Sequence, residues 1–374
     1  MNLPAVPAYV TDAGGFTDCP PGHRFNLYFP IWKTDWLFDK NGKAAALGQC
    51  LKLGSASAPL DALRARQLTL AEALPENRCH IIEARSTAPF ATGLGLKHPV
   101  ENGFAFLSPY GLPYLAGSGV KGVLRRAAEE LRDGGEEEGV THTVIAALFG
   151  HEERRGSLPP DQKERRAAHR GALTCWDVFP VPPKGELFVE IMTPHFNHYL
   201  QGSDTPHDAG KPNPIPFLAV PAGSDFRFVI TCEPGSLGNA IEPAQWKDLL
   251  DKIIQHAFDW LGFGAKTSVG YGAVEKLSDA EISAAKAQSA AAANRCDWVD
   301  QTIENLSKKN NAKPDDTLRS KGLAEAWKQI PDATLKARAK ADITARWQAK
   351  KWWDRPLGKA SVQAKAIYTE NDAP

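Results

Sequence analysis

The chain has 374 residues, of which 43% are hydrophobic and 24% charged, and its 44 Lys and Arg balance 44 Asp and Glu. This composition is typical of a globular protein with one large or two smaller domains, and no apolar run approaches the roughly 20 residues that span a bilayer. Because the net charge is zero, any nucleic-acid-binding surface must be local. The N-terminus lacks the features of an export signal, so we expect a cytoplasmic protein without membrane contact.

The six cysteines occur singly, without a Cys-x-x-Cys pair or a Cys/His cluster at zinc spacing. This scatter predicts reduced, buried thiols. We therefore expect neither a metal nor another cofactor.

Residues 1–78 predict an N-terminal arm and one helix, at about 60–73. The pattern then becomes regular, with a strand at 80–85, a long loop rich in Gly and Pro, and an amphipathic helix that begins after Gly119. The apolar face of this helix consists of Val120, Val123, Leu124, Ala127, Ala128 and Leu131.

Strand-like segments follow at 172–179, 186–192 and 225–230, before a second amphipathic helix that ends at Gly262 and a last strand at 271–277. The order strand, helix, strands, helix, strand is the plan of a ferredoxin-like or RRM-like domain with long loop insertions. We therefore predict the α+β class, with this domain at 79–279.

Residues 280–374 predict a helical C-terminal extension. Their apolar residues suggest three amphipathic helices, and the last stretch is locally basic. Trp347, Trp352 and Trp353 either stack on single-stranded RNA or form core and partner-docking contacts, and buried tryptophans are the commoner case.

Two glycine-rich loops carry the candidate chemistry. The first, Gly117-Ser118-Gly119-Val120-Lys121-Gly122, opens a helix, where backbone N–H groups and the helix dipole favour a phosphate, or where the glycines only form a tight turn. The second, Gly262-Phe263-Gly264-Ala265-Lys266-Thr267-Ser268-Val269-Gly270-Tyr271-Gly272, includes a run similar to a P-loop. It follows a helix and precedes a strand, the reverse of a P-loop, which excludes nucleotide hydrolysis at this loop. Its glycines either admit a sugar-phosphate backbone or only permit positive φ.

The pair of loops resembles the RAMP superfamily of CRISPR-associated proteins, over about residues 79–277. Within it, further stretches are similar to the subunit-six family of type III-B (Cmr) effector complexes: Gly93-Leu94-Gly95, His98-Pro99-Val100-Glu101-Asn102-Gly103, Pro113-Tyr114-Leu115-Ala116, Trp176-Asp177-Val178-Phe179-Pro180, Thr193-Pro194-His195-Phe196 and Pro214-Ile215-Pro216-Phe217-Leu218. The chain departs from the family where Gly119 replaces a familiar serine, and after Asp279 no counterpart is recognised.

The resemblance implies a non-catalytic RNA-binding subunit near the 3′ end of the guide RNA (crRNA). Its expected partners are guide and target RNA and the other Cmr RAMP subunits, including the backbone, small and terminal subunits. Matched motif by motif, the resemblance implies that Lys121, Arg125, Lys266 and Tyr271 contact RNA. The full set of expected RNA-binding residues is Gly117, Ser118, Gly119, Lys121, Arg125, Arg126, Gly264, Lys266, Thr267, Ser268 and Tyr271.

Two alternatives remain from the sequence. A metal-independent guide-processing endoribonuclease would need a general acid or base near a cationic phosphate clamp, and the loop histidines His98, His195, His198 and His207 are candidates. A structural metal would use His195, His198 and His207, with Asp204 and Asp208, on a loop that lacks a rigid element to fix the ligands.

Overall fold

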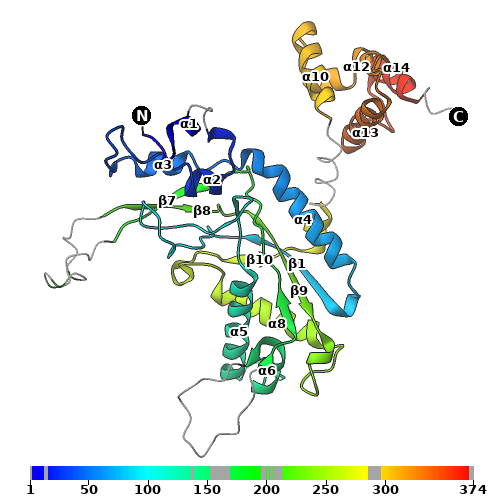
Figure 1. Cartoon of the computed structure of the whole chain (residues 1–374). Coiled ribbons are helices and arrows are strands. Elements are labelled where there is room, and N and C mark those ends of the chain that lie inside the picture. Colours follow the sequence, from blue (N-terminus) through cyan, green and yellow to red (C-terminus); the bar gives the residue numbers. More distant parts are fainter. Residues whose placement is uncertain are drawn as a thin grey trace, which may run out of the picture. The chain divides into compact units, whose positions relative to one another are not determined.

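The computed structural model describes residues 2–11, 16–135, 139–151, 169–194, 199, 202, 205, 213–284 and 296–369. The chain divides into two compact units, Met1–Leu277 and Ser278–Pro374 (Figure 1). Each unit has its own hydrophobic core. None of the helices in the described part of the chain combines the length and apolarity of a membrane-spanning segment.

Six elements form the centre of the first unit. They are β1 Cys79–Ser86, α5 Gly117–Gly134, β6 Leu173–Cys175, β9 Asp225–Cys232, α8 Trp246–His256 and β10 Val274–Lys276. The strands make an antiparallel sheet in the order β10-β1-β9-β6. This is the β-α-β-β-α-β arrangement of a ferredoxin-like domain, which confirms the predicted α+β class.

Side chains alternate between the two faces of this sheet, as the strand period of two requires. Ile82 of β1 and Phe226 and Phe228 of β9 are buried in the core that α5 and α8 cover. Several of the intervening positions are charged and pair across the strands: Arg227 Nε lies 2.5 Å from Glu83 Oε1, directly opposite in the register. One face of the sheet therefore belongs to the core and the other carries charge.

The two helices bury the apolar stripes that the sequence predicts. On α5, Val120, Leu124 and Leu131 are buried. α8 continues into a π-helical turn, η6 Ala257–Leu261, and stops before Gly262, whose φ of 66° is a backbone conformation that favours glycine. The predicted end of this helix is therefore confirmed.

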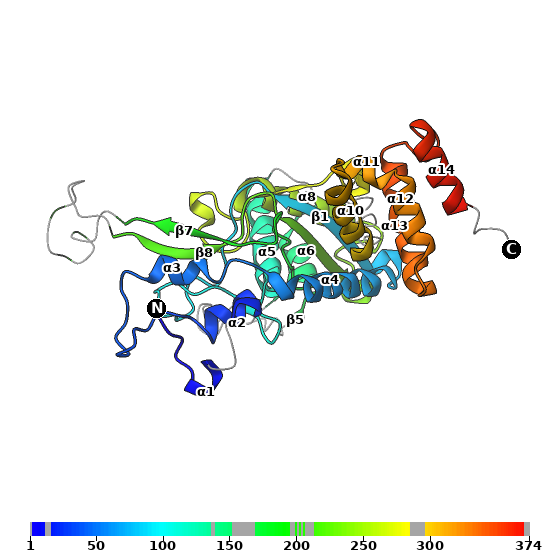
Figure 2. The same cartoon turned by 90° about the horizontal axis from the view of Figure 1, so that it is seen from above.

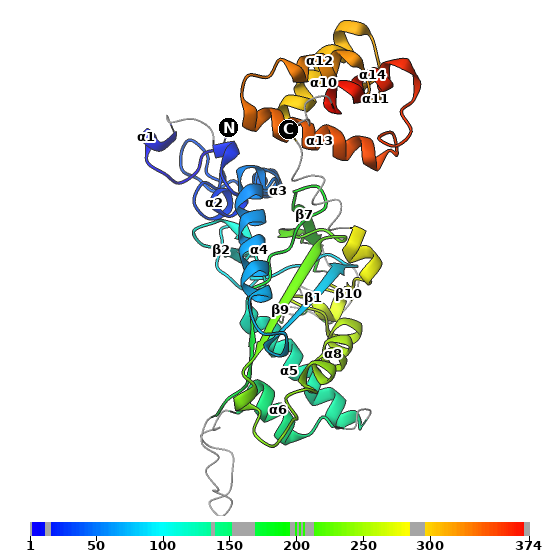
Figure 3. The same ribbon diagram turned by 90° about the vertical axis from the view of Figure 1, so that its right-hand side faces the viewer.

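A third helix, α4 Ser57–Glu72, lies on the face of the sheet opposite α5 and α8 (Figures 1 and 3). Two of its side chains form hydrogen bonds with the segment that follows β6. Arg64 Nη1 donates to the carbonyl of Phe179 at 2.6 Å, and Gln67 Nε2 donates to that of Asp177 at 2.9 Å. The charged face of the sheet is thus partly covered by a helix that precedes the ferredoxin-like core.

The N-terminal segment shares the core of the first unit, through Phe25, Phe29 and Ile31. Its aromatic residues therefore serve packing. The elements before β1 are α1 Ala8–Thr11, η1 Phe16–Asp18, α2 Pro21–Asn26, α3 Lys43–Gly48, η2 Gly54–Ala56, α4 and η3 Glu76–Arg78.

A β-hairpin is inserted between β6 and β9, formed by β7 Phe188–Met192 and β8 Ile215–Ala219. It lies beside α3 (Figure 2). The remaining short elements of the unit are β2 Phe106–Leu107, β3 Leu112–Pro113, α6 His142–Phe149, β4 Gly150–His151, β5 His169–Arg170, η5 Pro234–Ser236 and η7 Thr267–Val269.

The second unit consists of α10 Asp297–Asn310, α11 Pro314–Leu318, α12 Lys321–Lys328, α13 Ala333–Ala349 and α14 Gly358–Thr369. The described part of the unit thus has more helices than the three expected: residues 279–284 are also helical, α11 is one turn started by Pro314, and α14 has few large apolar residues. Trp347 is fully buried, and its indole N–H donates to the carbonyl of Leu318 at 3.1 Å. Trp352 and Trp353 are half-buried against the same core. The core interpretation of Trp347 is therefore the correct one.

Candidate nucleic-acid interface

The first glycine loop forms the N-terminal turns of α5. The backbone N–H of Gly117 donates to Asp177 Oδ1 at 2.7 Å, so a carboxylate of the chain already occupies this helix end. A Cβ on Gly117 would lie 2.1 Å from the carbonyl oxygen of Cys175. Glycine is therefore required here for contact within the protein, and a phosphate at this amide would have to displace Asp177.

Lys121 is also engaged inside the fold. Its Nζ donates to the carbonyl of Leu173 at 2.7 Å, and burial lowers the pKa of its ammonium group. The two arginines of α5 form ion pairs along the helix: Arg125 with Glu129 at 3.1 Å and Arg126 with Glu130 at 2.8 Å. Of these three cations, Arg126 is the most exposed and the most accessible to a ligand.

The exposed side of the same turns is formed by Ser118, Gly119 and Gly122. A Cβ on Gly119 would make only an ordinary contact with Leu115, and one on Gly122 would meet no atom within 4 Å. Glycine inside a helix costs about 1 kcal/mol relative to alanine. The fold does not require glycine at these two positions, whereas it does at Gly117.

The second glycine loop is fixed to the segment after β1. The backbone N–H of Ala265 donates to the carbonyl of Ala91 at 2.7 Å. A Cβ on Gly264, whose φ is 88°, would lie 2.3 Å from the same carbonyl oxygen and 2.6 Å from the Phe90 ring. Gly264 thus allows close packing within the protein. The loop follows η6 and precedes β10, which is the order that excludes a P-loop.

The polar residues of this loop lie against the β7–β8 hairpin. Lys266 Nζ is 2.8 Å from Met192 Sδ and 5.8 Å from the centroid of the Phe217 ring. Tyr271 packs near the same Phe217 ring. Its pKa is raised to about 12, mainly because it is partly buried and also because it bonds to the Glu190 carboxylate. Thr267 and Ser268 form η7, where Ser268 is exposed. The sequence does not predict these hairpin contacts, because they join residues 49 to 81 positions apart.

The first loop packs on Cys175 and Asp177, where β6 ends, and the second loop precedes β10. They belong to opposite edges, since α5 packs on β6 and the second loop leads into β10. Three strand spacings separate these edges, which is roughly 14 Å. The two loops can therefore contact one RNA strand only at separate nucleotides.

Of the four loop histidines, only His98 lies within the described residues. Its ring stacks on Phe25 at 3.7 Å between centroids, its Nε2–H donates to the carbonyl of Phe25 at 3.0 Å, and its Nδ1 accepts from the N–H of Val100 at 3.4 Å. Burial lowers its pKa. A neutral imidazole in these contacts is a packing group. His195, His198, His207, Asp204 and Asp208 lie outside the described residues, and the residues that are described hold no group of three potential metal ligands.

A family model for the RAMP superfamily matches residues 83–275, which is more than half of the chain. The chain belongs to the RAMP superfamily. The resemblance seen in the two glycine loops is therefore confirmed. The matched range of this RAMP chain includes both loops and ends before the second unit.

Two curated relatives of this RAMP protein are Cmr6 subunits. The CRISPR system CMR subunit Cmr6 of Saccharolobus solfataricus is 28% identical over 199 residues, 53% of this chain and 56% of that protein. The CRISPR system Cmr subunit Cmr6 of Pyrococcus furiosus is 26% identical over 243 residues, 52% of this chain and 68% of that protein. The RAMP chain thus spans little more than half the length of the first relative.

Two solved structures are also similar. A chain of the cryo-EM structure of the Type III-B Cmr-beta bound to cognate target RNA is 19% identical, with a TM-score of 0.43, over 64% of this RAMP chain and 71% of that chain. The crystal structure of Cmr6 from Pyrococcus furiosus is 24% identical, with a TM-score of 0.28, over 54% of this chain and 98% of that chain.

Proposed function

We propose that the chain is a non-catalytic RNA-binding subunit of a type III-B CRISPR (Cmr) effector complex. In this role it lies near the 3′ end of the guide RNA, contacts other Cmr subunits in the cytoplasm, and helps to hold guide and target RNA in antiviral defence. The family assignment and the names of the two curated relatives support this proposal.

The observation that carries the RNA-binding part is the exposed pair Gly119 and Gly122 on α5. Glycine at either position lowers the stability of the helix, and no contact with the described residues requires glycine there. Without side chains, they leave room for another backbone to approach the helix surface. Arg126, one turn further on the exposed side, supplies a cation for a phosphate.

The test is to fill this space. Gly122→Leu should reduce the amount of guide RNA and of other Cmr subunits that co-purify with the chain, without loss of thermal stability. Gly48→Leu is the matched control. Gly48 is exposed on α3, lies in the same unit, and a Cβ at this position would meet no atom within 4 Å. Equal RNA and subunit recovery in both variants would remove this face of α5 from the interface.

The non-catalytic part has a separate test. The purified chain should leave a guide-RNA precursor intact, because His98, the one of the four candidate histidines that lies within the described residues, is a half-buried neutral packing group. Specific cleavage of the precursor that is lost in His195→Ala or His198→Ala would replace this proposal with an endoribonuclease.

A further inference from the structure

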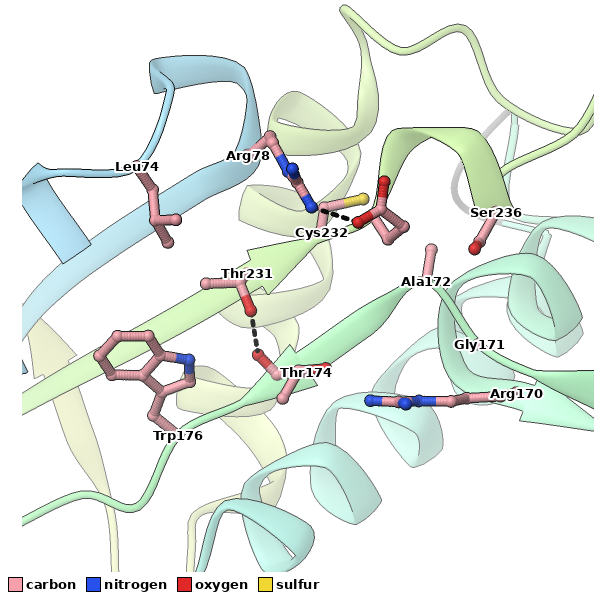
Figure 4. A pocket seen from close by; sticks show the side chains of 11 residues that line it. Leu74, Arg78, Arg170, Gly171, Ala172, Thr174, Trp176, Thr231, Cys232 and Ser236 are labelled. Atoms are coloured by element: carbon pink, nitrogen blue, oxygen red, sulfur yellow. Dashed lines mark hydrogen bonds and ion pairs between the residues drawn. The ribbon is translucent and has the colours of Figure 1, made fainter. Parts of the chain in front are cut away.

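A pocket of about 370 Å³ lies on the charged face of the sheet, beyond the C-terminal end of α4. Its floor is formed by β6 and the end of β9, where Thr174 and Thr231 stand opposite each other in the register (Figure 4). Thr231 Oγ1 donates to the carbonyl of Thr174 at 3.4 Å, and the Thr174 side chain is exposed. This is the part of the face that α4 leaves open.

One wall of the pocket is apolar. Trp176 and Leu74 line this side of the pocket, and both are half-buried against the cluster of Val229 (Figure 4). The indole N–H of Trp176 has no hydrogen-bond partner in the part of the chain that the structure describes. Trp176 therefore offers both a ring surface and a free donor.

The other wall is polar. Arg78 is paired with Glu233, so its charge is neutralised within the protein. Arg170 is exposed, and its side chain points across the floor towards Trp176 (Figure 4). The Arg170 side chain makes no hydrogen bond or ion pair with the described residues. The pocket thus has an available cation facing an aromatic wall.

These groups match the parts of one nucleotide. An aromatic ring stacks on a base, hydroxyl groups bond to sugar or base edges, and a free guanidinium binds a phosphate. The volume is near the lower limit of small-molecule sites, and an acidic protein side chain would leave the tryptophan wall unused. We infer that this pocket binds one unstacked nucleotide of an RNA strand, with the base on Trp176 and a phosphate at Arg170. The inference rests on the proposed function for the source of the RNA.

The pocket is separate from the second glycine loop. It lies at Thr231, the end of β9, whereas that loop leads into β10, beside the end of β1 that pairs with Asp225. Six residues of strand separate these positions, which is roughly 20 Å. The first glycine loop lies closer, because Gly117 packs on the backbone of Cys175 and Trp176, but it opens α5, which covers the other face of the sheet.

Cross-linking tests the placement directly. The full chain is irradiated with single-stranded RNA that contains 5-iodouridine, and then digested with trypsin. We expect an RNA adduct on the peptide of residues 171–184, which contains Trp176 and no internal Lys or Arg. Adducts confined to other peptides would overturn the inference.

Affinity for the same RNA gives a second test that does not depend on removing a packed residue. Thr174→Trp fills the pocket from an exposed strand position and should weaken binding at least about fivefold, the effect of losing one stacked base. Thr143→Trp, on an exposed position of α6, is the matched control.

Arg170→Gln tests the phosphate contact. This variant should reduce the slope of log affinity against log salt by about 0.7, the value for one phosphate contact on a single strand. Unchanged affinity and slope in both pocket variants would overturn the inference.

The two proposals fail differently. A chain that shows the adduct on residues 171–184 but does not co-purify with guide RNA and Cmr subunits supports the pocket and contradicts the proposed function. A chain that co-purifies with both and lacks the adduct contradicts the pocket alone.

Discussion

At the residue scale, the glycines of the two loops are present for different physical reasons. Gly264 is required by the fold, because a Cβ there would collide with Ala91 and Phe90. Gly122 is exposed with space around it. The same residue type in similar motifs thus serves internal packing in one case and leaves an open surface in the other.

This difference predicts opposite signs for one substitution. Gly264→Ala should lower the free energy of unfolding by about 2–4 kcal/mol, because it adds a clash at a positive φ. Gly122→Ala should raise it by about 0.5–1 kcal/mol, through higher helix propensity. Urea titrations of both variants check this, and a loss of stability in Gly122→Ala would show that the fold requires this glycine.

His98 predicts a pH dependence of stability. Burial lowers its folded pKa, so between that pKa and the unfolded value near 6.5 the unfolded chain binds more protons. The contribution of His98 is therefore present above pH 6.5 and is lost as the pH falls. We expect a lower urea midpoint at pH 5.5 than at pH 7.5, and a smaller difference in His98→Gln. The control, His142→Gln, changes an exposed histidine and should keep the full difference.

At the element scale, helix ends show where local rules are not followed. α13 ends at Ala349, and Lys351, shortly beyond it, has a φ of 57°, a left-handed conformation that usually selects glycine. The N–H of Trp352 donates to the carbonyl of Trp347 at 2.9 Å, which closes the turn. A lysine in this conformation costs about 1–2 kcal/mol.

Lys351→Gly should therefore stabilise the second unit by about 0.5–1 kcal/mol, since the strain removed exceeds the flexibility gained by the unfolded chain. Lys309→Gly is the contrasting control, because Lys309 is exposed in the last turn of α10 and should lose helix propensity. Calorimetry of the full chain measures both shifts. A lower melting temperature in Lys351→Gly would show that this lysine makes stabilising contacts that outweigh its strain.

At the scale of the whole molecule, the zero net charge is an average of two unequal units. Residues 278–374 carry 17 Lys and Arg against 13 Asp and Glu, so the first unit is acidic overall. The second unit uses some of its charge internally: Arg346 is 2.7 Å from the buried Asp342 and 2.6 Å from Asp300. Overall charge is therefore a poor guide to RNA binding in this chain.

Separate cores predict that the second unit can be removed. A chain that ends at Leu277 keeps the RAMP domain and both glycine loops, and it should retain RNA binding while its recovery with other Cmr subunits decreases. Calorimetry should lose one transition, and co-purification measures RNA and subunits in the same sample. Loss of RNA with full subunit recovery would show instead that the basic end of the chain clamps RNA.

The sequence by itself determined the order of helices and strands in the ferredoxin-like core, the buried faces of its two helices, the stop at Gly262 and the superfamily. All of these are local: periodicity, turn residues and short motifs act within one element or its ends. The tertiary structure decided which candidate groups are available. Asp177 occupies the Gly117 amide from 60 residues away, and Met192 contacts Lys266 from 74 residues away. The nucleotide pocket likewise joins segments distant in the chain. Such contacts depend on how the sheet is folded, and short sequence patterns carry no information about that arrangement.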